Sequence, residues 1–159
     1  MHWISLGKWL LICFAVAGIG GASTAREVKS WYPTLLRPGF SPPDWVFGPV
    51  WTLLYAMMTV AVWQVSLTPD SPQRTRGIIL FLIQLALNLG WTWLFFARHL
   101  IGRALVEIVV LWLMILATIL VFWRVSPLAA ALLVPYLMWV SFATLLNAGF
   151  WRLNRERKS

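Results

Sequence analysis

The chain has 159 residues, of which 60% are hydrophobic and only 11% are charged, and its mean hydropathy is +0.77. Soluble domains carry about a quarter charged residues, so this chain cannot cover a globular surface with polar groups, and an ordinary soluble domain is excluded. Its apolar runs are continuous and about 20 residues long, without the alternation of a membrane β-barrel. We therefore predict an all-α integral membrane bundle.

The positive charge is distributed between and after the apolar runs. A net charge of +8 placed in this way argues against nucleic-acid binding and indicates contact between flanking basic residues and lipid headgroups. Cys13 is the single cysteine, so an intrachain disulfide is excluded. His2 and His99 have no thiol or carboxylate at ligand spacing, and we expect no metal site.

Five membrane spans follow in chain order and form one domain over residues 1–159. We place them at about residues 3–22, 45–67, 77–97, 104–123 and 128–151. The first run could be mistaken for a signal peptide, but Trp3 and Trp9 are atypical of one and favour a retained helix. The GIGG stretch at residues 18–21 would let a neighbouring helix or a ligand approach closely.

A long loop is expected between the first two spans, at residues 23–44. Four prolines before Asp44 fix φ and withhold backbone donors, which makes regular helix improbable there; they are Pro33, Pro38, Pro42 and Pro43. The segment is also rich in aromatic residues. We predict an ordered loop that acts as a lid over a pocket.

The basic residues predict an orientation. Nine Lys and Arg residues gather on the side of the long loop and the C-terminus, and four lie on the other side. The positive-inside rule then places the C-terminus in the cytoplasm and the N-terminus outside. No Arg- and Ser-rich transit sequence precedes the first span, and we expect a bacterial membrane.

Polar residues inside apolar spans are costly and therefore informative. Asn88 shares a face of the third span with Gln84 and Trp91, at i−4 and i+3. It could bond another helix or contact a ligand, and the spacing leaves both open. Trp139, Ala143 and Asn147 share a face of the fifth span, as Phe47, Trp51 and Tyr55 do in the second. Trp51 and Trp139 lie too far in for an interfacial belt.

Conventional acid–base or nucleophilic chemistry is not indicated. Glu107 is the single carboxylate in an apolar run, close to the start of the fourth span, where a helix N-terminus stabilises negative charge. Ala86 and Gly90 form a small-xxx-small pair in the third span. This pair indicates either a dimer face or close packing within one bundle.

Three stretches in order resemble one family. They are WYPTLLRPGFSPPDWVFGPVWTLLY (residues 31–55), QLALNLGWTWLFF (84–96) and VSPLAAALLVPYLMWVSFATLLN (125–147). Together they are similar to the tryptophan-rich sensory protein/translocator protein (TspO/MBR) family, the peripheral-type benzodiazepine receptors. The resemblance covers nearly the whole chain, from about residue 31 to residue 152.

The resemblance implies a five-helix membrane protein, a homodimer, that binds porphyrins such as protoporphyrin IX and haem as ligands, with no obligatory cofactor. Sterols and benzodiazepine-type compounds are further ligands of the family. Carried over position by position, the ligand-binding residues would be Tyr32, Pro42, Trp51, Asn88, Trp91, Trp139, Ala143 and Asn147. The dimer would form through the third helix, at Ala86 and Gly90.

One position departs from the family pattern. Its sterol-recognition motif expects an aromatic residue where Ala148 stands, and Phe150 is out of phase with it, so sterol binding is expected to be weak. We expect a receptor or transporter acting in tetrapyrrole transport, sensing or regulation. The alternative is light-dependent porphyrin degradation, an enzymatic activity with Trp51 and Trp139 as the reactive residues. A scaffolding protein with an incidental pocket is the third hypothesis.

Overall fold

Each apolar run of the sequence becomes one long helix. The computed structural model describes residues 2–158, and within them no strand occurs. The helices are α1 His2–Ser30, α2 Phe47–Ser66, α3 Pro72–Thr92, α4 Ile101–Val125 and α5 Pro127–Asn154. All five are long and apolar enough to cross a membrane. The predicted all-α bundle of five membrane-spanning helices is confirmed.

Four short elements extend or connect the long helices. Two 3₁₀ turns, η1 Tyr32–Thr34 and η2 Asp44–Val46, lie between α1 and α2. A π-helix, η3 Trp93–Ala97, continues α3, and a last 3₁₀ turn, η4 Arg155–Lys158, follows α5.

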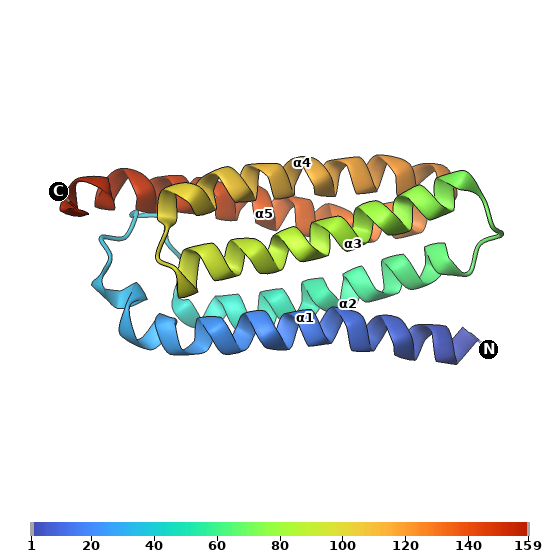
Figure 1. Ribbon diagram of the computed structural model, residues 1–159, viewed down its shortest axis with the longest axis horizontal. Coiled ribbons are helices and arrows are strands. Elements are labelled where there is room, and N and C mark those ends of the chain that lie inside the picture. The colour runs from blue at the N-terminus through green and yellow to red at the C-terminus, as the bar shows by residue number, and fades with distance from the viewer. Residues whose placement is uncertain (1, 159) are drawn as a thin grey trace.

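The helices run side by side along the long axis of the molecule (Figure 1). The segment joining α1 to α2, the α3–α4 connection and the C-terminus lie at one end, and the N-terminus lies at the other. An odd number of helices dictates this placement of the termini on opposite sides.

The first helix is longer than the sequence predicted, and the loop is shorter. α1 continues to Ser30 instead of residue 22, so the predicted lid at residues 23–44 is wrong in its first part. The hydroxyls of Ser23, Thr24 and Ser30 each donate to the carbonyl four residues earlier. This back-bonding satisfies the polar side chains without breaking the helix.

The spans α3 and α4 begin earlier than predicted, whereas α2 begins at Phe47, two residues after the predicted boundary. α3 starts at Pro72 instead of residue 77, because Ser71 accepts a hydrogen bond from Arg74 N at 3.1 Å and caps the helix, with Pro72 in the first turn. α4 begins at Ile101 and α5 ends at Asn154, each three residues beyond the predicted boundary.

The remaining loop, residues 31–43, is fastened to the bundle. Leu36 N donates to Asn154 Oδ1 and Asn154 Nδ2 donates to Leu36 O, both at 3.0 Å, so one α5 amide holds the loop backbone from two sides. Arg37 forms a two-pronged ion pair with Asp44, at 2.9 and 3.2 Å. This hydrogen bonding to Asp44 raises the pKa of Arg37. The loop is therefore ordered by specific contacts.

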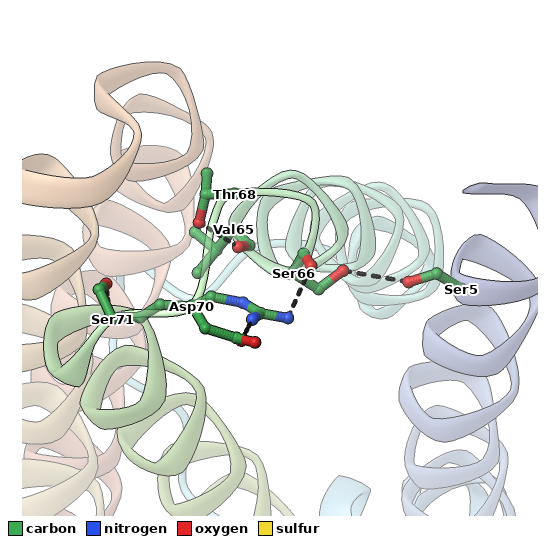
Figure 2. A network of polar contacts seen from close by, with 7 residues as sticks. Ser5, Val65, Ser66, Thr68, Asp70 and Ser71 are labelled. Carbon is green, nitrogen blue, oxygen red and sulfur yellow. Dashed lines mark hydrogen bonds and ion pairs between the residues drawn. The ribbon is translucent and has the colours of Figure 1, made fainter. Parts of the chain in front are cut away.

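The opposite end of the bundle is tied by polar contacts among α1, α2 and α3 (Figure 2). The hydroxyls of Ser5 and Ser66 are 3.1 Å apart. Arg74 donates to Ser66 O at 2.9 Å and pairs with Asp70. These contacts hold the start of α1 against the end of α2, while the other halves of the two helices border a cavity.

Candidate ligand-binding cavity

A cavity of about 610 Å³ lies inside the bundle, towards the end that carries the loop. Its walls come from α1, α2, α3, η3 and α5, with Tyr32 and Asp44 contributed by the segment between α1 and α2; among the described residues α4 contributes none. The volume falls in the range typical of small-molecule sites, about 300–1,000 Å³. The helices thus enclose a space of ligand size at the depth of the membrane spans.

Seven of the eight predicted ligand-binding residues line this cavity. They are Tyr32, Trp51, Asn88, Trp91, Trp139, Ala143 and Asn147. The eighth, Pro42, does not line it; it is half-buried in the loop, and Asp44, two residues later, reaches the wall instead. The backbone is extended at Pro43 (φ −58°, ψ 143°), and it carries the chain from the loop to Asp44.

Aromatic rings from α2, α3 and α5 line the cavity. Trp51 lies with its ring centroid 6.4 Å from that of Trp91 and 6.0 Å from that of Tyr55. On the α5 side, the rings of Trp139 and Phe47 are 5.9 Å apart. A flat aromatic ligand would find ring faces and edges on several sides.

The buried amides serve as links between helices as well as cavity wall. Asn88 Nδ2 donates to Tyr136 Oη at 2.7 Å, and Tyr136 Oη donates to Gln84 Oε1 at 2.8 Å. Tyr55 Oη donates to Asn88 Oδ1 at a long 3.4 Å. Asn88 therefore both bonds across helices and faces the cavity, as the two interpretations of this residue predicted. One N–H of its amide has no acceptor among the described residues.

A second amide network joins α3, α4 and α5. Trp91 Nε1 donates to Asn147 Oδ1, and Asn147 Nδ2 donates to the carbonyl of Ile101, both at 3.0 Å. The orientation of the Trp91 ring in the cavity wall is thereby fixed by α5.

Trp139 has a donor that the protein does not satisfy. Its Nε1 is buried and has no hydrogen-bond partner among the described residues. A buried unpaired N–H is costly, and Trp139 lines the cavity. A ligand acceptor at this point of the wall would remove that cost.

The predicted site residues did not include any residue of α1, although α1 forms one wall of the cavity. α1 contributes Phe14, Ala17, Gly18, Gly20, Gly21, Thr24, Ala25, Val28 and Lys29. The GIGG stretch was the signal. Gly20 is buried against α3, and a Cβ there would make ordinary contact with Thr92 Cγ2, at 3.7 Å. At Gly18 and Gly21 a Cβ would meet nothing within 4 Å, because these positions face open space.

The cavity is open on the side between α1 and α2. Seven of its lining residues are also exposed at the molecular surface; they are Phe14, Gly18, Gly21, Ala25 and Lys29 of α1 and Gly48 and Thr52 of α2. All seven belong to helices that are long and apolar enough to span the membrane. The opening therefore faces the lipid.

The loop side of the cavity is closed by packed aromatic rings. Tyr32 is buried and its ring lies 5.1 Å from that of Phe150 and 4.7 Å from the Arg37 guanidinium. Burial raises the pKa of Tyr32, so it remains a neutral phenol. Beside it, the Trp31 indole stacks on the His99 ring at 4.0 Å, and His99 Nε2 is 2.9 Å from Glu27 Oε2. Phe150 is thus buried in the interior, between the rings of Tyr32 and Phe95.

Glu107, Ala86 and Gly90 lie outside the cavity. A Cβ on Gly90 would be 2.9 Å from Glu107 Oε1, so Gly90 packs against α4 of the same chain, while Ala86 is exposed. The expected homodimer through this helix stays a prediction. In residues 2–158 no cluster of His, Cys, Asp or Glu could hold a metal ion.

Comparison with known proteins identifies the family. The family model described as TspO/MBR matches residues 9–152. The chain belongs to the TspO/MBR family. Its TspO/MBR relatives include the tryptophan-rich protein TspO of Chlorobaculum tepidum, 44% identical over 152 residues that cover 95% of this chain and 96% of the relative.

Two further TspO/MBR relatives show how widely the match extends. Protein CrtK of Rhodobacter capsulatus is 33% identical over 156 residues, covering 98% of each chain. The translocator protein of Homo sapiens is 39% identical over 139 residues, covering 86% of this chain and 82% of the human one. This chain is therefore a multi-pass membrane protein of the TspO/MBR family, and the resemblance found in the sequence is confirmed.

Proposed function

We propose that this protein is a membrane receptor or carrier for porphyrins, among them protoporphyrin IX and haem, and acts in tetrapyrrole transport, sensing or regulation. The observation that supports this most directly is the aromatic cavity of about 610 Å³ with Trp51, Trp91 and Trp139 in its wall. Stacking of an indole on a flat π-system contributes about 0.5–1.5 kcal/mol per pair beyond burial. A macrocycle offers a ring face large enough to use several indoles at once.

The polar groups of the cavity fit the edges of such a ligand. The unpaired Trp139 Nε1 and the unused N–H of Asn88 are donors for acceptor atoms of the ligand. Arg37 is already paired with Asp44, so Lys29, which lines the cavity at the loop end, is the cation available to a ligand carboxylate. The ring would lie among the tryptophans with its acidic edge towards Lys29.

The ligand would reach the cavity from the bilayer, through the opening between α1 and α2. The loop is held to α5 by the paired bonds of Leu36 with Asn154, whereas the α1 side of the opening consists mainly of small residues. A hydrophobic porphyrin partitions into lipid, so a lateral route spares it the passage through water.

A titration of purified protein in nanodiscs with protoporphyrin IX in the dark tests this proposal, with tryptophan fluorescence as the readout. The double variant Trp51→Phe with Trp139→Phe should weaken binding about tenfold, because two indole contacts are reduced. The matched control is Trp45→Phe with Trp123→Phe, since these rings are 75% and 61% exposed. Equal affinities for both double variants would contradict the assignment.

Light-dependent porphyrin degradation is the second candidate, because oxidisable indoles at Trp51 and Trp139 line the same cavity. Illuminating the same samples in air distinguishes it from binding alone. A bilin-like absorption band that appears in the wild type and not in Trp51→Phe would favour the enzyme. An unchanged spectrum would favour the receptor or carrier.

A further inference from the structure

A second hollow, of about 260 Å³, lies between the first turn of α4 and the last turn of α5. Its lining residues are Leu100, Ile101, Gly102, Arg103, Trp151, Asn154 and Arg155. None of them lines the ligand cavity. The hollow can therefore bind a ligand of a different kind from that of the cavity, and the side chains of its wall indicate which kind.

Two arginines without ion-pair partners border this hollow. Among the side chains that the structure describes, neither Arg103 nor Arg155 forms an ion pair. Asp44 pairs with Arg37 and Glu27 contacts His99, while Glu156, next to Arg155, does not line the hollow. The Arg155 guanidinium lies over the Trp151 ring, 5.4 Å from its centroid. Such a cation–π contact orients the guanidinium without neutralising its charge.

The uncharged groups of the hollow add donors and no free side-chain acceptor. Trp151 Nε1 makes no hydrogen bond within the described residues, and it would be 2.9 Å from a Cβ on Gly102. The missing side chain at Gly102 therefore lets the indole N–H lie against the start of α4. Asn154 Oδ1, the amide oxygen nearby, is occupied by Leu36 N. Guanidinium and indole donors around one space select an anion with several oxygens.

The position of the hollow indicates where that anion comes from. It lies at the ends of two membrane spans, Ile101–Val125 and Pro127–Asn154, so it is level with the polar border of a bilayer. We propose that this hollow binds the phosphate of an anionic phospholipid headgroup. This goes beyond general attraction between a basic end and a charged membrane, because two specific arginines of the several at this end would carry the binding.

The test is lipid binding by the purified full chain in detergent, measured by native mass spectrometry with phosphatidylglycerol. The double variant Arg103→Ala with Arg155→Ala should bind it at least tenfold more weakly, since two charge-assisted contacts are lost. The matched control, Arg26→Ala with Arg152→Ala, removes the same charge from the same end, at residues that do not line the hollow. It should bind like the wild type.

Further arms decide between the sources of phosphate and guard against misfolding. Phosphatidylcholine should bind less tightly than phosphatidylglycerol, and inorganic phosphate at millimolar concentration should not displace the lipid; displacement would assign the hollow to free phosphate and overturn the lipid proposal. Gly102→Ala should also weaken lipid binding by displacing Trp151, while its far-UV circular dichroism stays that of the wild type. Equal losses of lipid affinity in the two double variants would show that only the total charge of this end matters, and would overturn the proposed site.

Discussion

At the scale of single residues, the polar groups within the spans carry both stability and recognition. Tyr136 is fully buried and its hydroxyl is shared between Asn88 and Gln84. In a membrane interior such bonds are made because no water competes for the groups. The same hydroxyl therefore holds Asn88 in the position from which it faces the cavity.

Tyr136→Phe should lower the free energy of unfolding by about 1–2 kcal/mol, because two buried amides each lose a partner. Tyr55→Phe is the matched control, since its hydroxyl donates to Asn88 across 3.4 Å and a long bond of this kind contributes little. Thermal unfolding in one detergent would measure both variants. An equal decrease in melting temperature for the two would show that the Asn88–Tyr136–Gln84 chain has no special role.

Residue types inside the membrane made much of the cavity predictable. Asn88, Trp51 and Trp139 were predicted as site residues because amides and deep indoles are unusual in apolar spans, and all three line the cavity. The glycines of α1 were not among the predicted site residues, because a glycine has no side chain whose chemistry would indicate a ligand contact. Pro42 was carried over from a family pattern, and the course of the loop places Asp44 at the wall instead.

At the scale of elements, hydropathy predicted the helices better than their ends. The fall in hydropathy after residue 22 marks where the chain becomes polar, but α1 continues to Ser30. The hydroxyls of Ser23, Thr24 and Ser30 are accommodated there by bonds to carbonyls of the same helix. The start of α3 was readable from the sequence, because Ser71 followed by Pro72 is a helix-start pattern. Local capping chemistry, which hydropathy does not include, decides the start of α3.

The helix α1 also offers a direct test of the lateral route. Gly18→Leu should slow association of protoporphyrin IX several-fold, because the new side chain projects into the open side of the cavity. Gly7→Leu is the control: its Cβ would also meet nothing within 4 Å, but Gly7 does not line the cavity. Stopped-flow fluorescence in nanodiscs measures both rates. Identical rates would place the route elsewhere, for instance under the loop.

At the scale of the whole molecule, the two ends of the bundle differ in charge and in architecture. The end that carries the α1–α2 loop and the C-terminus (Figure 1) has nine Lys and Arg residues in the sequence, against four at the other end. It also holds the closed side of the cavity and the hollow between α4 and α5. The orientation of the chain therefore decides which leaflet would supply the proposed phospholipid.

The positive-inside rule predicts that this end faces the cytoplasm. In a Cys13→Ser background, which removes the single and buried native thiol, Gln73→Cys at the α2–α3 end should react with a membrane-impermeant maleimide on intact cells. Leu36→Cys, in the loop and 49% exposed, should react only after the membrane is opened. The reverse labelling pattern would invert the topology, and it would move the headgroup site to the outer leaflet while leaving the cavity and its lateral opening unchanged.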